Sequence, residues 1–358
     1  MKKLEISTPA LIVDLDLFEK NVKKMAGFFA DKAAKLRPHF KAHRCPEIAR
    51  IQMRAGAIGI TCAKLGEAEH LADLGFGHLL VANQIAGEEK IERFARLCRK
   101  GVDAIVAVDS LALAREMDRI GRARKTRLNI LLEVNIGMNR CGLPVGEELR
   151  TLARFCALAN GLRLRGIMGY EGHLVGKPQG VEKERHVRAA LAILTGFAGE
   201  LRAAGIPVEI VSSGGTGTYW ITGAYPGITE VQAGSYCVMD PYFLRAGADF
   251  ELASTVLVTV ISRPAKDLAI GDGGLKSFHP TLGMPLVKSF KGATVEKLNA
   301  EHCYIRLAPS ARPLKVGDKM EMVVPYVDGT FNLHDRIYAV RKDKVEKIWA
   351  TTGRGRSN

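Results

Sequence analysis

Short apolar, β-branched runs alternate with longer amphipathic segments from residue 10 to about residue 240. Strands that alternate with helices in this way are typical of repeated βα units around a parallel sheet. The pattern predicts nine strands, at residues 10–14, 35–43, 57–63, 78–84, 104–110, 128–135, 165–173, 208–215 and 230–236. A closed parallel barrel takes eight strands, so we expect the first one, which precedes the regular repeat, to lie outside the barrel.

Segments of helical period connect these strands, at residues 47–55, 66–74, 88–100, 111–122, 147–158 and 182–204. After about residue 254 the pattern changes to short strands separated by Pro, Gly and charged turns, at residues 256–262, 268–270, 292–298, 303–307, 319–324 and 336–341. The sequence therefore predicts an α/β protein, with an eight-stranded (β/α) barrel over residues 10–250 and a smaller β domain over residues 251–350.

Composition fits a folded enzyme, since hydrophobic residues make up 47% of the chain and 37 of its 358 residues are glycine. The seven cysteines are scattered without CxxC pairs, and the sequence shows neither a charged-then-apolar leader nor an apolar run that could span a membrane. These features predict a cytoplasmic protein with no membrane partner.

The formal net charge of +14 could indicate nucleic acid, an anionic surface or small anionic ligands. The basic residues are spread along the predicted helices, for example over residues 90–100 and 115–127, without an aromatic-interleaved stripe. Solvated helix faces explain this distribution better than a nucleic-acid site. We therefore expect no nucleic-acid partner.

Polar and apolar residues alternate in the stretch Arg37-Pro38-His39-Phe40-Lys41-Ala42-His43-Arg44. If this stretch is a strand, Arg37, His39, Lys41 and His43 share one face. On an open sheet that face could simply be wet, but in a barrel it lines the dry interior. The prediction that Lys41 points inward thus depends on the barrel.

A glycine-rich run, Ser212-Ser213-Gly214-Gly215-Thr216-Gly217-Thr218, follows the strand predicted at 208–215. This strand would be the seventh of the barrel, and the loops after strands seven and eight commonly bind phosphate in such folds. Glycines let backbone amides converge on an anion. A plain turn is the alternative, but the next strand also ends in small donor residues, Ala233-Gly234-Ser235-Tyr236, which favours the phosphate site.

A lysine opposite a phosphate cradle suits a Schiff base with a phosphorylated aldehyde cofactor, because a neutral amine can attack a carbonyl. The alternative is an exposed surface lysine. Two further candidates lie at or after the ends of predicted strands: His173 as a general base, rather than a structural histidine, and Arg140 as a carboxylate or cofactor ligand, rather than a solvated turn residue.

Taken together, the motifs resemble those of the D-threonine aldolase and D-serine dehydratase family. They are TPAL at 8–11, RPHFKAHR at 37–44, CAKLGEAE at 62–69, MNRCG at 138–142, GYEGH at 169–173, SSGGTGTY at 212–219 and EVQAGSYCVMD at 230–240. The resemblance implies an alanine-racemase-like fold that binds pyridoxal 5′-phosphate (PLP), a homodimer, and a β domain that also takes in the first strand, at about residues 8–15.

The resemblance also implies roles for single residues. Lys41 would bind PLP covalently, Tyr170 would lie beside the cofactor ring, Arg140 would lie near its hydroxyl group, and His173 would take the proton of the substrate β-hydroxyl. We add His39, on the predicted face of Lys41, to the cofactor-binding set. The residues implied around the phosphate are Ser213, Gly215, Thr216, Gly234, Ser235 and Tyr236.

The sequence departs from the family at a metal site. Members hold a divalent metal, Mn²⁺, Mg²⁺ or Zn²⁺, with a His-x-Asp or His-x-Cys pair that precedes an Asn-Leu-x-Asp segment. Here Asp328 matches the carboxylate, but Tyr326 stands in place of the histidine. A phenol is a poor ligand for such ions at neutral pH. We therefore expect the site to be lost or rebuilt, with His302 or His334 as substitutes.

The loss of the metal-binding histidine affects which of the reactions implied by the resemblance we expect. Hydroxide is a poor leaving group and needs the Lewis acid more than retro-aldol cleavage does, and cleavage could use His173 with the Tyr326 hydroxyl orienting the substrate. We therefore predict a PLP-dependent lyase that cleaves D-β-hydroxy-α-amino acids to an amino acid and an aldehyde. A racemase and a D-serine or hydroxyaspartate dehydratase are the alternatives. A non-catalytic PLP carrier is disfavoured by the predicted β domain.

Overall fold

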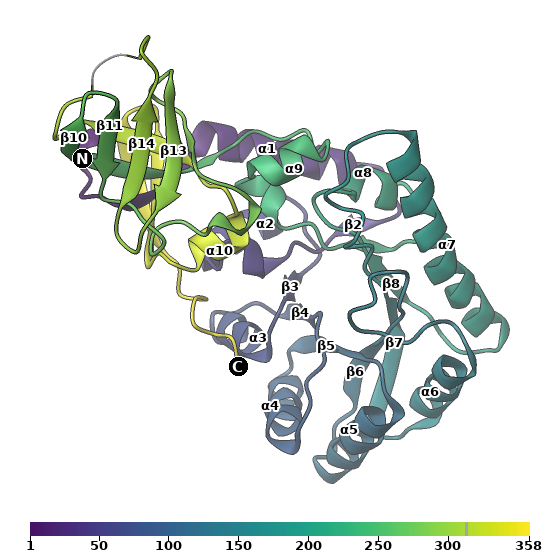
Figure 1. The fold of residues 1–358 in the computed structure, drawn as a ribbon. Helices are drawn as coiled ribbons and strands as arrows, with labels where there is room; N and C mark the ends of the chain where they lie inside the picture. Colours follow the sequence, from purple (N-terminus) through teal and green to yellow (C-terminus); the bar gives the residue numbers. More distant parts are fainter. Residues whose placement is uncertain (312–313) are drawn as a thin grey trace. The chain divides into compact units, whose positions relative to one another are not determined.

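The computed structural model describes residues 1–311 and 314–358, which form two compact units. The barrel unit comprises Met25–Lys41, Ala49–Gly234 and Arg356–Asn358. The β unit comprises Met1–Lys24, Ala42–Ile48 and Ser235–Gly355. The elements of both units are labelled in Figure 1.

Within the described residues, the sheet of the barrel unit has eight strands in the order β2-β9-β8-β7-β6-β5-β4-β3, and all of its ladders are parallel. Between the outermost strands, β2 and β3, the Ile58 and Thr61 amides donate to the Leu36 and Pro38 carbonyls, each at 2.9 Å. The fold class predicted from the sequence is confirmed. The strands are β2 (Lys35–Leu36), β3 (Ile60–Cys62), β4 (His78–Val81), β5 (Asp103–Val108), β6 (Leu128–Glu133), β7 (Leu162–Met168), β8 (Ile210–Ser213) and β9 (Glu230–Val231).

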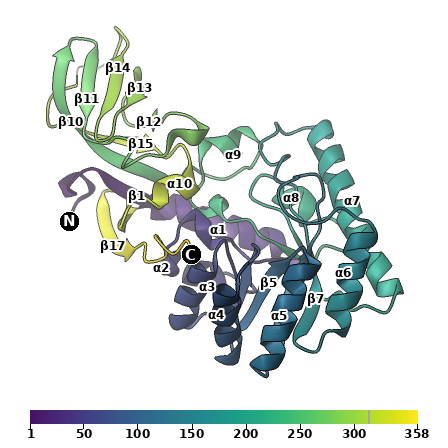
Figure 2. The same ribbon diagram turned by 60° about the horizontal axis from the view of Figure 1, so that its bottom comes forward.

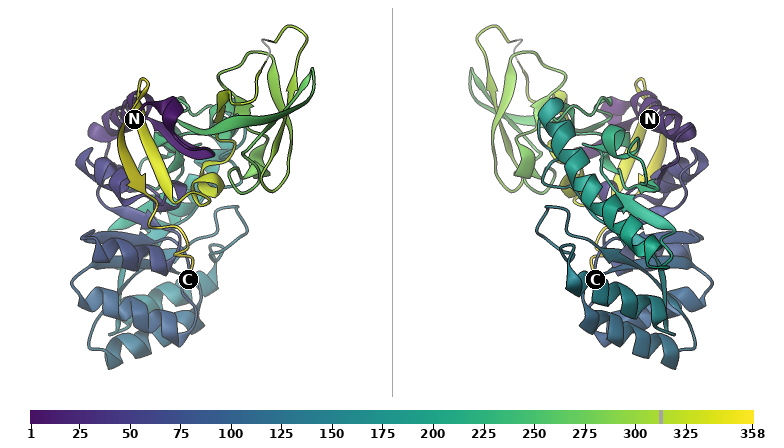
Figure 3. Two further views of the ribbon diagram at one scale, coloured as in Figure 1. Left: turned by 90° about the vertical axis from the view of Figure 1, so that its left-hand side faces the viewer. Right: turned by 90° about the vertical axis from the view of Figure 1, so that its right-hand side faces the viewer.

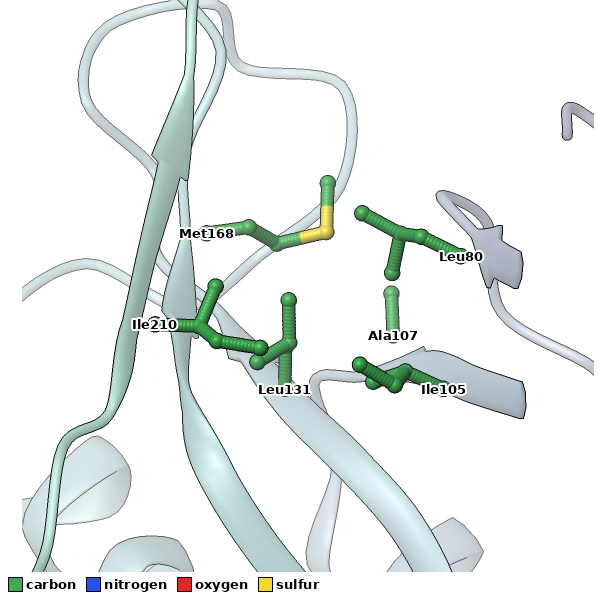
Figure 4. Packing of buried hydrophobic residues seen from close by; sticks show 6 residues of the cluster. All are labelled: Leu80, Ile105, Ala107, Leu131, Met168 and Ile210. Carbon is green, nitrogen blue, oxygen red and sulfur yellow. The ribbon is translucent and has the colours of Figure 1, made fainter. Parts of the chain in front are cut away.

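Helices α3 to α7 run along the outer side of this sheet (Figures 1 and 2). Strands covered on both faces must be apolar along their whole length, which explains runs such as Ala104–Val108. On the inner side, buried side chains from β4 to β8 pack against one another (Figure 4): Leu80, Ile105, Ala107, Leu131, Met168 and Ile210. The helices are α3 (Leu65–Asp73), α4 (Glu88–Arg99), α5 (Leu111–Ala123), α6 (Glu147–Leu158), α7 (Val181–Ala203) and α8 (Tyr219–Thr222).

The β unit contains a mixed sheet in the order β13-β14-β11-β10-β1-β16-β17, with β15 paired to β10 and β12. Strand β1 lies antiparallel to β10 and parallel to β16, so that strands from the first and last parts of the chain share one sheet (Figure 3). The strands are β1 (Ala10–Asp14), β10 (Ser254–Ala265), β11 (Leu268–Gly271), β12 (Leu286–Val287), β13 (Ala293–Leu298), β14 (Cys303–Leu307), β15 (Lys319–Val323), β16 (Arg336–Arg341) and β17 (Lys344–Ala350).

The β unit also has short helices, and two longer helices contain residues of both units. None of the helices in the described ranges has the length and apolar character needed to cross a membrane. The short α-helices are α9 (Pro241–Arg245) and α10 (Val327–Phe331), the shared ones are α1 (Leu15–Ala30) and α2 (Pro46–Arg54), and the 3-10 helices of the chain are η1 (Lys3–Glu5), η2 (Phe40–Ala42), η3 (Ser235–Cys237) and η4 (Pro280–Leu282).

The prediction of one strand over residues 35–43 was wrong. Strand β2 ends at Leu36, and residues Phe40–Ala42 form the 3-10 helix η2. Successive side chains of a 3-10 helix are about 120° apart rather than 180°, and Pro38 has no amide proton to extend a ladder. The alternation from Arg37 to His43 therefore does not place their side chains on one face.

A buried ion pair fixes the start of this segment. The Arg37 guanidinium donates from Nε (3.0 Å) and Nη2 (2.9 Å) to Oε2 of Glu230, and both side chains are buried. Glu230 is the first residue of β9, and it lies opposite Lys35 of β2 in the parallel ladder. The positive charge of Arg37 is thus balanced within the barrel unit.

Replacing Glu230 with alanine is expected to lower the free energy of unfolding by about 3–5 kcal/mol, because the buried Arg37 charge loses its counterion. Urea denaturation measures this change. The matched control is Glu200→Ala, which removes the partner of Arg150 in a pair that is more than a third exposed and should have a much smaller effect, because water screens an exposed ion pair. Equal effects of the two substitutions would contradict the stabilising role of the Arg37–Glu230 pair.

Candidate active site

The segment after β7 and the glycine-rich loop after β8 lie at the same edge of the barrel sheet. Met168 of β7 is in register with Ser212 of β8, and the Gly169 amide donates to the Ser212 carbonyl at 3.1 Å. In (β/α) barrels, the carboxyl ends of the strands carry the functional loops. This edge therefore brings together Tyr170–His173 and Ser213–Thr218.

Glu171 is the centre of this arrangement, and its side chain is completely buried. Its Oε2 accepts hydrogen bonds from the Ser213 hydroxyl (2.9 Å) and the Gly214 amide (3.2 Å). Its Oε1 accepts from the hydroxyls of Thr218 (2.8 Å) and Thr222 (2.7 Å). Glu171 lies in the GYEGH motif, but the sequence does not predict that its side chain contacts the glycine-rich loop.

Glycines are required at particular points of the loop. Gly214 has a φ of +82°, which favours glycine. A Cβ atom at Gly217 would overlap the Val175 carbonyl oxygen, and one at Gly215 would lie 3.4 Å from the Tyr170 ring. The loop thus packs closely against the segment that follows β7.

The donors of this loop suit a phosphate group. It contains backbone amides and the buried hydroxyl of Thr216, which are the donor types that bind phosphate. The Gly214 amide donates to Glu171, and the Gly215 amide donates to the Thr218 hydroxyl oxygen at 3.3 Å. The nearby carboxylate of Glu171 already accepts donors on both oxygens, so its charge is offset locally. The Ser213 hydroxyl donates to Glu171. Ser213 stays a predicted neighbour of the phosphate, but through atoms other than this hydroxyl. Gly215 and Thr216 stay predicted phosphate neighbours.

Tyr170 and Arg140 are brought together beside the loop. The Arg140 guanidinium carbon lies 5.7 Å from the centroid of the Tyr170 ring, within the range of a cation–π contact. The same ring lies next to Gly215. An aromatic surface with a cation on it, beside a glycine-rich loop, suits a planar anionic cofactor.

His173 packs against the loop after β6. A Cβ atom at Gly137 would lie 2.9 Å from Cε1 and 3.0 Å from Nε2 of His173, so that only glycine leaves room for the ring. Asn135 shapes this loop, since its Oδ1 accepts from the Gly137 (3.0 Å) and Asn139 (3.2 Å) amides. Partial burial and the positive charge of Lys177 lower the pKa of His173. A neutral imidazole at pH 7 can accept a proton.

Lys41 is the middle residue of η2, which begins directly after His39, and His39 forms an isolated bridge with Thr61 of β3. Its side chain and that of His39 are half-buried, and both belong to the barrel unit. Gly234 is the last residue of the barrel unit in this part of the chain. His43 lies in the β unit, where its Nδ1 accepts the Cys45 amide at 3.2 Å, as in a structural turn.

The remaining predicted site residues lie in the β unit. The Ser235 hydroxyl donates to Oδ1 of Asp328 at 3.2 Å, and Tyr236 packs against Phe250 with ring centroids 5.6 Å apart. Tyr326 precedes α10, which begins at Val327. Its ring meets that of His279 edge to face at 5.5 Å. Ser235 is thus grouped with Asp328, and Tyr326 with His279.

The residues around Asp328 do not fit the metal site of the family. His302 is exposed in the turn between β13 and β14, and His334 is half-buried with its Nε2 directed at the Ser277 carbonyl, 2.9 Å away. Over the described ranges, no group of three His, Cys, Asp or Glu side chains could hold a metal ion. Compared with the His-x-Asp pair of the family, positions 326 and 328 lack the histidine, because Tyr326 stands in its place.

A neighbouring buried carboxylate supports the position of α10. Asp240 caps α9 through the Phe243 amide (3.2 Å) and accepts the Val327 amide with its other oxygen (3.2 Å). Burial raises the pKa of Asp240 to about 6. Its hydrogen bonds to backbone amides mark it as a structural group of the β unit.

Comparison with known proteins agrees with this geometry. The family model for the alanine racemase N-terminal domain matches residues 13–241, and that for a putative serine dehydratase domain matches residues 253–340. The D-threonine aldolase of Arthrobacter sp is 34% identical, over 98% of this chain and 93% of that protein. The 3-hydroxy-D-aspartate aldolase of Paracoccus denitrificans (strain Pd 1222) is 32% identical, over 99% of this chain and 94% of that protein.

The fold is also that of a solved relative. The crystal structure of D-threonine aldolase from Filomicrobium marinum matches with a TM-score of 0.95 and 34% identity, over 99% of this chain and 98% of that one. Similarity of this extent confirms the resemblance inferred from the motifs: the chain belongs to the D-threonine aldolase and D-serine dehydratase family of alanine-racemase-like proteins.

Proposed function

We propose that this protein is a PLP-dependent lyase that cleaves D-β-hydroxy-α-amino acids to an amino acid and an aldehyde. The observation that carries the proposal is the segment 170–173, in which Glu171 accepts the Gly214 amide of the glycine-rich loop and His173 has a lowered pKa. The proposal is supported by similarity to two aldolases of D-amino acids along almost the whole chain.

In this proposal the barrel unit supplies most of the groups that hold the cofactor. Lys41 would bind it covalently, the loop residues Gly215 and Thr216 would hold its phosphate, and Tyr170 and Arg140 would lie at its ring. When bound, PLP accepts the electron pair released as the Cα–Cβ bond breaks. Gly234, Ser235 and Tyr236 stay predicted neighbours of the phosphate, and His39 of the cofactor.

His173 acts on the substrate in this proposal. Its unprotonated ring nitrogen accepts the proton of the β-hydroxyl group, and the hydroxyl oxygen becomes the carbonyl oxygen of the aldehyde as the Cα–Cβ bond breaks. A lowered pKa keeps the imidazole neutral near pH 7. The role predicted for Tyr326, in which its hydroxyl orients the substrate, stays a prediction.

A dehydratase is the second candidate, because residues 253–340 match the putative serine dehydratase domain. It is ranked lower because expulsion of hydroxide needs a Lewis acid, and Tyr326 replaces the histidine of the metal-binding pair. A racemase is a further alternative. The homodimer predicted from the sequence stays a proposal, as does the cytoplasmic location.

The test is incubation of the PLP-loaded protein with D-threonine, L-threonine and D-3-hydroxyaspartate. The expected result is aldehyde release from at least one D-substrate and none from L-threonine. Release of ammonia and a keto acid would identify a dehydratase instead. A protein that gains no absorbance band on addition of PLP would overturn the cofactor assignment.

Aldehyde release is expected to continue at an unchanged rate after EDTA treatment, since Tyr326 breaks the His-x-Asp pair. Tyr326→His restores that pair with Asp328 and should create measurable Mn²⁺ binding by titration calorimetry, with Tyr326→Phe as the matched control that should not bind. Loss of wild-type activity in EDTA with rescue by Mn²⁺ would show that other side chains complete the metal site.

A further inference from the structure

Glu171 has a role that the proposed chemistry leaves unexplained. It is a carboxylate without exposed surface, and removal of a charge from water is unfavourable unless hydrogen bonds replace the solvent. Here Ser213, Gly214, Thr218 and Thr222 provide those hydrogen bonds. The Glu171 side chain is therefore fixed by hydrogen bonds to protein groups and is not directed at a reacting group.

The donors lie on both sides of the anion-binding loop. Ser213 and Gly214 stand at its start, where β8 ends, and Thr218 stands at its end, directly before α8. Thr222 adds a contact from α8 itself. One carboxylate thus connects the end of β8, the end of the loop and the following helix. Residues 215–217 therefore lie between two positions, Gly214 and Thr218, that are both hydrogen-bonded to Glu171.

The segment that carries Glu171 is itself held in place. The Leu174 amide donates to the Glu171 carbonyl at 2.9 Å. The buried Lys183 of α7 donates to the carbonyls of Val175 (3.2 Å) and Lys177 (2.9 Å). The Val175 carbonyl in turn packs against Gly217. The loop is thus held by the hydrogen bonds of Glu171 and by the packing of Val175 against Gly217.

We propose that Glu171 is a positioning residue that holds the loop at 213–218 in the conformation that binds the phosphate of PLP, an inference that rests on the proposed function. Glu171 contributes no bond to the cofactor. It fixes the backbone amides of the loop before binding, so that less conformational entropy is lost when the phosphate arrives. Its effect should therefore appear in affinity for the phosphate group.

Glu171→Gln is the informative substitution because it keeps the size of the side chain. A carboxylate accepts hydrogen bonds on both oxygens, whereas an amide accepts on one atom and donates from the other. The donors that now meet one carboxylate oxygen would then face an NH₂ group. Glu171→Ala would leave all of them unsatisfied in a buried site and is less suitable, since the chain could fail to fold.

The measurement is the dissociation constant of the full-length protein for PLP and for pyridoxal, which has the same aldehyde but no phosphate. Glu171→Gln should raise the constant for PLP about tenfold or more, the size expected for loss of hydrogen bonds to a charged group. The constant for pyridoxal should change less than about twofold. Hydrogen exchange of the Gly214 amide should also become faster.

Two further variants serve as controls. Thr222→Val removes one donor from outside the loop and should raise the PLP constant in the same direction, whereas Thr222→Ser keeps the hydroxyl and should not. Asp118→Asn changes another buried carboxylate, which accepts the Gly161 amide at 2.7 Å, and should leave the PLP constant unchanged. The Thr222 pair still decides the question if Glu171→Gln fails to fold.

An unchanged PLP constant in Glu171→Gln, or equal losses for PLP and pyridoxal, would overturn the positioning role while leaving the proposed function intact. A wild-type protein that binds neither compound would overturn the proposed function, and the role of Glu171 at a phosphate with it.

Discussion

Replacement of Lys41 with alanine is expected to abolish covalent capture of PLP and to lower aldehyde release at least about 10³-fold, because the reaction loses its nucleophilic amine. Borohydride reduction of the wild-type protein should attach a pyridoxyl group to the peptide that contains Lys41. Mass spectrometry of the digested protein measures this attachment, and aldehyde assays measure turnover.

Two other lysines of the barrel unit make this test specific. Lys183 is the rival amine, because burial lowers its pKa to about 8. Lys35 is the matched control, since it lies in β2 with its ammonium group on the Phe29 and Ala30 carbonyls. Lys35→Ala should still be labelled at Lys41. Label on Lys183, or full activity of Lys41→Ala, would contradict the assignment.

His173→Gln is expected to lower kcat/KM by about 10²–10⁴-fold, the usual contribution of a positioned general base. Protonated imidazole cannot accept a proton, so wild-type kcat/KM should rise with pH up to the pKa of His173 and stay level above it. Partial burial and Lys177 lower that pKa, so the rise should end below the usual histidine value of about 6.5.

The pH profile distinguishes a base from a packing residue. In His173→Gln the acidic limb assigned to His173 should disappear, and the residual rate should be level across that range. His78→Gln is the matched control, because His78 lies at the amino end of β4 beside Asp103. A wild-type profile in His173→Gln would show that another group takes the proton.

The barrel could be predicted from the sequence because strands buried on both faces are apolar along their length. Each predicted barrel strand overlaps an observed one. Strand β17 was missed for the opposite reason: most of its side chains are exposed, so Lys344–Ala350 lacks an apolar face. Helix α1 was also not predicted, although its sequence carries the signal of an amphipathic helix. Its apolar residues recur at helical spacing and are all buried: Leu15, Phe18, Val22, Met25 and Phe29.

The candidate site was predictable to the extent that its chemistry lies in local motifs. The glycine-rich loop and the GYEGH segment are continuous in sequence, and the structure brings them together through the β7–β8 ladder. The side-chain face assigned around Lys41 failed because η2 breaks the alternation. Glu171 was missed because a buried carboxylate is understood only from its partners, such as Thr222, 51 positions away.

The contact between Tyr326 and the imidazole of His279 in the β unit could not be predicted either. Tyr326 meets His279, which lies in a different segment of the chain. Gly329 permits this approach, since a Cβ atom there would lie 2.5 Å from Cγ of His279. No spacing rule in the sequence links these positions, because the contact depends on how α10 packs within the β unit.

The central claim is that this chain breaks a Cα–Cβ bond of a D-β-hydroxy-α-amino acid. Proton NMR of the PLP-loaded protein with D-phenylserine tests it most directly, because substrate and every candidate product are seen in one spectrum. The account predicts glycine and benzaldehyde in equal amounts, with no signal from a keto acid. Formation of phenylpyruvate, or conversion to the L-isomer without benzaldehyde, would contradict it.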